Sequence, residues 1–177
     1  VLIAAGGISF VFRDKFVGGK AGLLVESRPV ATVYVEGEQV GTTPYEVERS
    51  AGEISLRLIP IATDGPLAPW NAKVVLTEGI TTAVRRDFGA TDEESSGEIM
   101  SFEKILPRGA ELVAVSTPDA AALFIDGVNK GFTPKKIESV AVGGHMLTFS
   151  HPGFLDREIV VKTEAGYKLV VTSFLAK

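Results

Sequence analysis

The fold of this chain is decided by a stretch that occurs twice. Residues 125–134 read IDGVNKGFTP, and residues 35–44 read VEGEQVGTTP, ninety residues earlier. Both copies have an acidic residue before a glycine, a second glycine four residues later, and a closing Thr-Pro pair. An acidic-Gly pair after an apolar run predicts a tight hairpin turn, because glycine adopts positive φ angles without steric cost. Each copy is therefore predicted to form a strand, a turn, a short strand and an exit.

The surroundings of the two copies also match. A Ser-x-Pro sequence precedes each copy, and a glycine turn before a further strand follows it. Each Thr-Pro pair is expected to end a short strand, since proline removes a backbone donor and disfavours helix in the residue before it. The residues that mark the motif are Pro29, Gly37, Gly41 and Pro44 in the first copy and Pro118, Asp126, Gly127, Gly131 and Pro134 in the second. So many features in one fixed order indicate a duplication.

The rest of both copies reads as short strands. Residues 32–35 and 54–58 in the first copy, and residues 122–125 and 146–149 in the second, are rich in β-branched and aromatic residues. We expect residues 73–77 and 81–84 to form a closing hairpin of the first copy. The sequence predicts an all-β fold made of two tandem small antiparallel β-sandwich domains.

Four segments follow from this pattern. We expect residues 1–22 to be the remnant of a membrane anchor and stalk, residues 23–90 the first sandwich, residues 91–109 a linker, and residues 110–177 the second sandwich. Acidic and small residues at 92–97 favour a linker, whereas residues 99–106 fit both a strand and a helical turn.

The first twelve residues, VLIAAGGISFVF, carry no charge. As a helix they would rise about 18 Å, less than the hydrocarbon core of about 30 Å. They fit the last half of a transmembrane anchor, and they also fit a first strand or buried helix of the folded domain. The cations Arg13, Lys15 and Lys20 argue against an exported body, because positive residues favour the cytoplasmic side.

Composition removes several classes of function. The formal net charge is −4 and the Lys and Arg residues are scattered, so no nucleic-acid partner is expected. The chain has no cysteine, which excludes disulfides and thiolate zinc sites but does not decide the compartment.

At the motif residues the chain resembles the PEGA domain family, which consists of small β-sandwich modules. The resemblance rests on Ser-x-Pro, the Asp-Gly hairpin, Gly-x-Thr-Pro and a later Pro-Gly-aromatic step, which is Pro152-Gly153-Phe154 in the second copy. The first copy departs from the pattern at residues 61–70. The resemblance implies a membrane-anchored envelope or surface protein, for which no catalytic residues are a family property.

No motif for catalysis, a metal or a cofactor stands out. His145 and His151 are six residues apart in a strand-turn-strand region, and we expect them to be turn or partly buried imidazoles rather than metal ligands. The oxygens of Asp126 and Asn129 fit turn geometry better than a calcium loop, which needs further ligands. The acidic residues 92–94 are expected to be solvated. We therefore expect no enzyme, metal or cofactor.

The candidate contact residues are aromatic. Trp70 follows a proline-rich stretch and is expected to cover the core or the interdomain seam, with surface contact as the alternative. A glycan-binding module would use Trp70, Tyr34 or Tyr45 as stacking platforms. A small cluster of Lys130, Lys135 and Lys136 is expected to protect a sheet edge.

The sequence thus favours a non-enzymatic, membrane-anchored, extracytoplasmic structural or binding module. Its expected partners are the membrane, through the N-terminal segment, and envelope proteins or glycans. The alternatives are a glycan-binding module and the accessory domains of a larger envelope enzyme.

Overall fold

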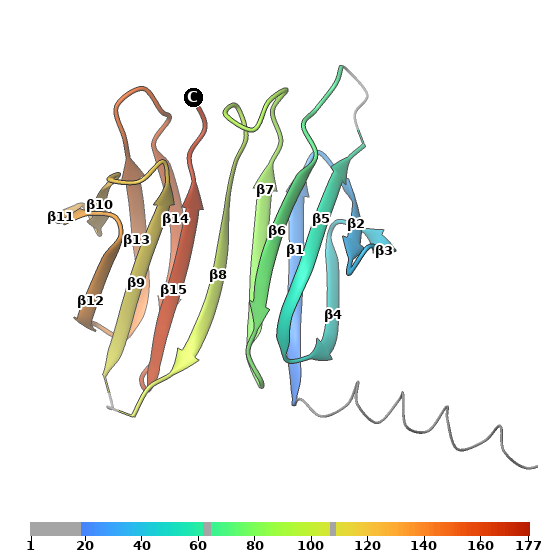
Figure 1. Cartoon of the computed structure of the whole chain (residues 1–177). Helices are drawn as coiled ribbons and strands as arrows, with labels where there is room; N and C mark the ends of the chain where they lie inside the picture. Colours follow the sequence, from blue (N-terminus) through green and yellow to red (C-terminus); the bar gives the residue numbers. More distant parts are fainter. Residues whose placement is uncertain (1–18, 62–64, 107–108) are drawn as a thin grey trace, which may run out of the picture.

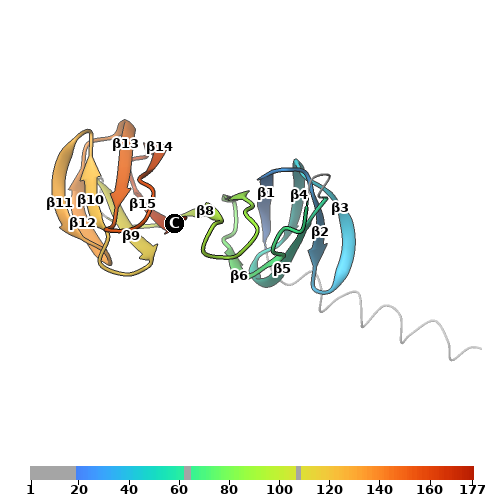
Figure 2. The same cartoon turned by 90° about the horizontal axis from the view of Figure 1, so that it is seen from above.

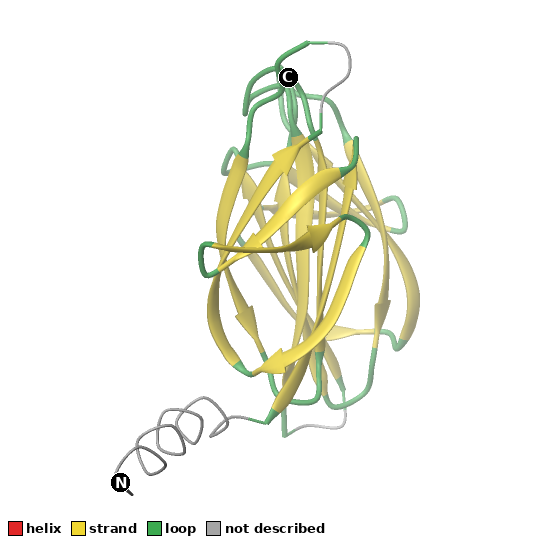
Figure 3. Cartoon of the chain, turned by 90° about the vertical axis from the view of Figure 1, so that its right-hand side faces the viewer, coloured by secondary structure: helices red, strands yellow, loops and turns green. Residues whose placement is uncertain are grey.

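The computed structural model describes residues 19–61, 65–106 and 109–177 of the 177 residues. These described residues form fifteen strands in three sheets and contain no helix (Figures 1 and 3). The predicted all-β fold is confirmed. None of the described residues forms a helix that could cross a membrane. The expected anchor at residues 1–12 lies outside the described residues, and residues 20–22 of the expected stalk belong to the first strand.

The first sandwich has seven strands. They are β1 (Lys20–Arg28), β2 (Ala31–Val35), β3 (Glu38–Thr42), β4 (Tyr45–Ser50), β5 (Gly52–Pro60), β6 (Trp70–Leu76) and β7 (Thr81–Asp87). One layer has the order β4-β1-β7, with β1 and β7 parallel, and the other layer has the order β3-β2-β5-β6. Alternate residues of β1 and β5 point inward, as a strand with one buried face requires.

The second sandwich repeats this topology strand for strand. Its strands are β9 (Ala110–Thr117), β10 (Ala122–Ile125), β11 (Val128–Phe132), β12 (Lys135–Val140), β13 (Gly143–Ser150), β14 (Arg157–Thr163) and β15 (Tyr167–Phe174). One layer has the order β12-β9-β15, with β9 and β15 parallel, and the other has the order β11-β10-β13-β14. The duplicated sequence therefore forms two sandwiches with one topology.

One additional strand joins the two sandwiches. Strand β8 (Ser96–Lys104) pairs antiparallel with β7 on one side and with β15 on the other. The two three-stranded layers thereby become one seven-stranded sheet, β12-β9-β15-β8-β7-β1-β4. The expectation that residues 91–109 form a linker is corrected at residues 96–104, which form this strand. Small and acidic residues at the start of this strand are typical of an exposed linker, but Gly97 and Glu98 are buried between the sandwiches.

A pseudo-two-fold axis runs along β8. Strands β7 and β15 are both antiparallel to β8, so they point the same way, while the strand order is reversed on the two sides. A half-turn about an axis parallel to the strands produces this arrangement, and it also exchanges the faces of the sheet. The two four-stranded layers accordingly lie on opposite faces, which Figure 2 shows in a view along the strands.

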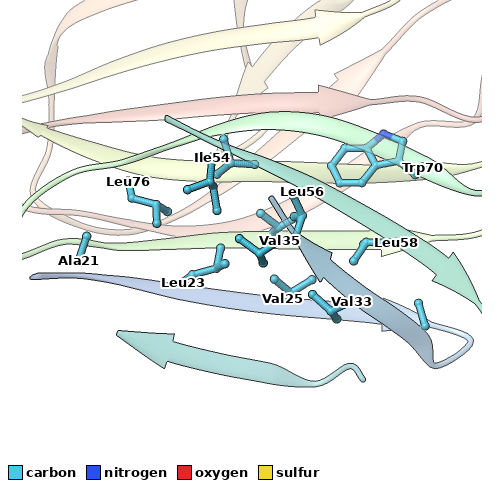
Figure 4. Packing of buried hydrophobic residues seen from close by; sticks show 13 residues of the cluster. Ala21, Leu23, Val25, Val33, Val35, Ile54, Leu56, Leu58, Trp70 and Leu76 are labelled. Carbon is cyan, nitrogen blue, oxygen red and sulfur yellow. The ribbon is translucent and has the colours of Figure 1, made fainter. Parts of the chain in front are cut away.

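The two faces of β8 pack against different cores. Ile99 packs against the first core, whereas its neighbours Met100 and Phe102 pack against the second, since successive side chains of a strand point to opposite faces. Figure 4 shows the first core, where Leu23 and Val25 of β1 meet Leu56 and Leu58 of β5. This two-sided burial explains why residues 99–106 matched no single periodic pattern.

The predicted closing hairpin of the first sandwich is wrong. Strand β6 pairs with β5 and strand β7 pairs with β1, so residues 77–80 cross from one layer to the other. Both strands have an apolar inner face, and a sandwich buries these faces best when they lie in opposite layers. Adjacent strand patterns with a short turn between them do not distinguish this crossing from a hairpin.

The hairpin turns of the motif have the predicted glycine geometry. The φ angles are +53° at Glu36 and +81° at Gly37, and +50° at Asp126 and +77° at Gly127. The acidic side chain of each turn also accepts a backbone hydrogen bond from another strand. Glu36 Oε1 accepts the backbone N–H of Ser55 at 2.5 Å, and Asp126 Oδ1 accepts that of Met146 at 2.9 Å. Each carboxylate thus links a hairpin turn to the neighbouring strand of its layer, which is β5 in the first sandwich and β13 in the second.

A hydroxyl pair explains the Ser-x-Pro and Gly-x-Thr-Pro elements. In the second sandwich Thr133 Oγ1 lies 2.5 Å from Ser116 Oγ and accepts the backbone N–H of Ala121 at 3.0 Å, while Ser116 Oγ donates to the Pro118 carbonyl at 2.6 Å. The first sandwich has the same bonds at Ser27, Pro29, Ala31 and Thr43, with distances from 2.6 to 2.9 Å. We call each set a Ser-Thr network. All four motif prolines follow cis peptide bonds.

Candidate functional site

The seam between the sandwiches has two sides that the pseudo-two-fold axis relates. Aligning the registers places Trp70 of β6 and Arg157 of β14 in equivalent positions, because they pair with Leu58 and Phe149. Phe174 of β15 is likewise equivalent to Asp87 of β7. Trp70 contacts Phe174 on one side, and Arg157 contacts Asp87 on the other. The same interdomain contact is aromatic on one face and ionic on the opposite face.

The ionic side is closed by Arg157. Its guanidinium donates from Nε to Glu98 Oε2 at 2.7 Å, and from Nη1 to Asp87 Oδ2 at 3.1 Å and to Ser96 Oγ at 2.8 Å. Glu98 exposes only 3% of its surface, so the ion pair lies in a water-poor place where charge-assisted bonds are strong. A polar groove of about 600 Å³ opens beside these residues.

A second arginine extends the ionic side to the first strand of the chain. Arg85 donates to Glu26 Oε2 at 2.7 Å, and its Nη1 lies 3.6 Å from Glu98 Oε1. The hydrogen bond to Glu26 raises the pKa of Arg85 above its usual value. The carboxylates between β1, β7 and β8 are thus balanced by guanidinium groups, which suits a structural network.

The aromatic side forms an apolar groove of about 430 Å³, which we call the seam groove. Trp70 and Phe174 meet edge to face, with ring centroids 5.7 Å apart. Phe154, which belongs to the Pro-Gly-Phe step of the second copy, lines the groove from the second sandwich. Pro69 and Pro118 complete its apolar walls. Pockets of this volume and lining are typical of binding sites for small molecules and peptide segments.

Arg86 also lines the seam groove. Its guanidinium carbon lies 5.3 Å from the ring centroid of Trp70 and 5.8 Å from that of Phe174. Arg86 is 2% exposed, and its charge is balanced by Asp92, whose Oδ1 accepts from Nη2 at 2.9 Å. Its Nε has no hydrogen-bond acceptor among the described residues. Burial lowers the pKa of Arg86, and Asp92 opposes that shift, but a guanidinium stays charged at any ordinary pH.

The structure separates the three aromatic residues that the sequence proposed as platforms. Trp70 belongs to the first core and exposes 6% of its surface, so it seals the seam instead of offering a free ring to a glycan. Tyr45 packs against the same core from β4. Tyr34 lies on the outer face of β2, half-buried, with its hydroxyl 3.4 Å from Gln39. These residues form no common site.

The lysine cluster lies at sheet edges. Lys135 and Lys136 are on β12, the last strand of the seven-stranded sheet, and Lys130 is on β11, the last strand of its layer. Lys136 pairs with Glu111 at 3.3 Å and with Glu138 at 3.4 Å. Charges at such positions discourage edge-to-edge association of sheets.

His145 makes a defined ion pair with Asp126. Its Nδ1 lies 2.6 Å from Asp126 Oδ2, and its Nε2 lies 2.8 Å from the carbonyl of Ala141. These two acceptors suit an imidazolium that donates from both nitrogens. The bond to Asp126 raises the pKa of His145, and the bond from His145 lowers the pKa of Asp126. No group of His, Cys, Asp or Glu that could hold a metal occurs among the described residues.

The seam residues Arg86, Glu98, Phe154, Arg157 and Phe174 were not found from the sequence. Their contacts join residues that are 59 to 70 positions apart on the ionic side, and no local pattern reports such pairs. The repeat is the one feature of the sequence that indicates these residues. When its two copies are aligned, Arg157 occupies the position of Trp70, and this change from an aromatic ring to a charge marks a position where the copies differ.

Comparison with protein families finds a PEGA domain at residues 110–175, which is the second sandwich. PEGA domains are β-rich modules that typically occur in extracytoplasmic or surface proteins. The first sandwich has the same topology, but the PEGA match does not extend to it. Neither the curated proteins nor the solved structures contain a significant match to the chain.

Proposed function

We propose that this chain is a non-catalytic structural and binding module of the cell envelope, built from two tandem PEGA-like sandwiches and held at a membrane by its N-terminal segment. The PEGA match supports the extracytoplasmic location. The fusion of both sandwiches through one sheet supports a structural role, since a continuous ladder fixes their relative orientation.

The observation that carries the binding role is a diagonal row of apolar residues across the outer face of the second sandwich. Phe132, Phe124, Met146 and Val160 contribute one residue from each of the four strands. Phe132 and Val160 are 64% and 70% exposed. We call these four residues the outer patch. Exposed apolar clusters of this kind mark interaction surfaces.

The first sandwich gives an internal comparison. The positions equivalent to Phe132, Met146 and Val160 are Thr42, Ser55 and Lys73, because the strand registers coincide. The shared topology therefore does not require apolar residues at these places. Their presence in one copy favours a task that the other copy does not have.

The size of the face indicates the kind of partner. Four strands about 4.8 Å apart, over about five residues of 3.3 Å each, cover roughly 300 Å². A standard stable interface takes about 800 Å² from each partner. The outer patch alone is therefore too small for a stable homodimer, and we infer a transient contact with another envelope protein.

The test replaces three patch residues by their counterparts in the first sandwich: Phe132→Thr, Met146→Ser and Val160→Lys. Such surface changes are expected to alter the free energy of unfolding by about 0.5 kcal/mol each or less. In cells that produce the natural full-length protein, chemical cross-linking should give defined products with the wild type and lose them with the triple variant. Ser55→Ala is the matched control on the first sandwich. Unchanged cross-linking by the triple variant would contradict the binding role.

Location is tested separately. A membrane-impermeant amine reagent added to intact cells should label the exposed Lys130 of the natural protein. Labelling of Lys130 only after lysis would exclude the extracytoplasmic location.

A further inference from the structure

We propose that the seam groove binds an extended, proline-rich segment of a partner protein that carries basic side chains. This inference rests on the proposed binding role and gives the partner a chemistry. It concerns the aromatic side of the seam, which is distinct from the outer patch.

The lining of the groove fits proline rings. Phe174 and Phe154, which are partly exposed, provide aromatic surface above the buried ring of Trp70, and Pro69 and Pro118 provide rigid apolar walls. Polyproline II segments dock in aromatic-lined grooves, because their preformed conformation loses little entropy on binding. The groove's volume of about 430 Å³ suits a short segment.

Arg86 favours a ligand with free oxygen acceptors. The cation is buried among aromatic rings, and its one ionic partner, Asp92, has a side chain that is 73% exposed. A polyproline II segment makes no internal hydrogen bonds, so its carbonyl oxygens remain free acceptors that this buried positive charge attracts from below the groove surface. A purely hydrocarbon ligand would leave this buried charge with the single carboxylate that it already has.

The rim of the groove favours a basic ligand. Asp92 and Glu93 line the groove and are exposed, and Glu94, which follows them in the chain, is exposed as well. Arg86 balances Asp92, and Lys177 balances Glu93 at 2.7 Å, so the cluster keeps one carboxylate in excess. Lys or Arg side chains of a ligand would gain from this charge, more at low than at high ionic strength.

The sole tryptophan of the chain provides the assay, because Trp70 lies in the groove. The ligand is an acetylated synthetic peptide of prolines with a lysine near each end, titrated into the protein while tryptophan fluorescence is recorded. We expect a saturable change. The same peptide with glutamates in place of the lysines should bind about tenfold more weakly.

Two variants locate the site. Glu93→Lys should weaken the lysine peptide about fivefold, whereas the matched reversal Glu158→Lys, beside the ionic groove on the opposite face, should change nothing. Phe154→Ser should weaken binding about tenfold, with thermal unfolding followed to verify that the protein is folded. Glu93→Lys provides a test that does not depend on an apolar side chain of the fold.

Three results would overturn the inference: no saturable fluorescence change, equal affinity for the lysine and glutamate peptides, or a fluorescence change that appears on concentrating the protein alone together with a dimer mass. The last would identify a second copy as the occupant. If peptide binding fails while surface labelling and patch-dependent cross-linking succeed, only this inference fails and the proposed function stands.

Discussion

At the scale of single residues, Thr133 joins three parts of the second sandwich through one hydroxyl group. It is 4% exposed, and its Oγ1 serves Ser116 and the backbone of Ala121 at once. Buried polar groups that lose a partner keep the cost of leaving water. The Ser-Thr network therefore makes the serine and the threonine of the repeated motif depend on each other.

Thr133→Val is expected to lower the free energy of unfolding by about 1–3 kcal/mol, because the shape is kept while the N–H of Ala121 loses its acceptor and Ser116 Oγ keeps only its bond to the Pro118 carbonyl. Urea denaturation measures the change. Thr42→Val, at an exposed position of β3, is the control and should have an effect near zero. A Thr133→Val variant as stable as the wild type would show that the hydroxyl pair contributes no stability.

The His145–Asp126 pair predicts a dependence of stability on pH. The folded-state pKa of His145 is raised above 6.5, so its contribution is complete below that value and is lost as pH rises through the folded pKa. The folded-state pKa of Asp126 is lowered below 3.8, so its contribution is complete above that value and is lost as pH falls through the folded pKa. The pair should stabilise most between about pH 4 and 6.5.

The measurement is the difference in unfolding free energy between the wild type and His145→Gln as a function of pH. The difference should be largest inside this window and shrink on both sides. In an Asp126→Asn background the same histidine substitution should give a flatter curve. A difference that grows from pH 6.5 to 9 would contradict the assignment of an imidazolium.

At the scale of elements, β8 decides how the chain is organised, and Gly97 decides how β8 fits. A Cβ atom at Gly97 would lie 2.3 Å from the carbonyl oxygen of Arg85 on β7, closer than any two such atoms can approach. Glycine is therefore required for the close approach of the two strands.

Gly97→Ala is expected to destabilise the protein by about 1–3 kcal/mol, the usual cost of overpacking a tight contact. Thermal unfolding measures it. Gly144→Ala on β13 is the matched control, because a Cβ there meets nothing within 4 Å, and it should leave the midpoint nearly unchanged. Equal midpoints for the two variants would mean that β8 can shift without cost.

The sequence predicted those elements that have one buried face. Strands β2 and β5 alternate clearly because each covers a single core, and the motif turns were predicted because Gly37 and Gly127 need positive φ angles. For β8 the sequence left a strand and a helical turn open, because Ile99 and Met100 are adjacent and both apolar, each facing a different core. The seam was missed for a related reason, since Arg157 and its partners meet only after both sandwiches have folded.

At the scale of the whole molecule, the ionic side of the seam is expected to couple the stability of the two sandwiches. Arg157→Ala leaves the carboxylate of Glu98, with a side chain 4% exposed, without its main partner. Removing one member of a buried ion pair typically costs about 3–5 kcal/mol. We expect a loss of that order, with the two sandwiches unfolding at different urea concentrations.

Two signals detect the separation. Fluorescence of Trp70 reports the first core and its contact with Phe174 at the seam, while far-ultraviolet circular dichroism reports the strands of both sandwiches, and coincident curves indicate one transition. Replacing both partners, by Arg157→Met with Glu98→Leu, should restore most of the stability, since an apolar pair can substitute for a buried ion pair. Lys73→Ala, which breaks the exposed pair with Glu53, is the control and should leave the unfolding curves nearly unchanged. Coincident curves for Arg157→Ala would argue against coupling through this pair.

The axis along β8 also determines how the protein responds to mechanical load. Hydrogen bonds of an antiparallel pair lie across the strands, so a pull parallel to β8 shears the whole ladder at once, whereas a pull across it opens the bonds one after another. Strand β8 shares eight residue pairs with β15 but five with β7. Tension along the strands would therefore first part β8 from the first sandwich, and β8 would remain attached to the second.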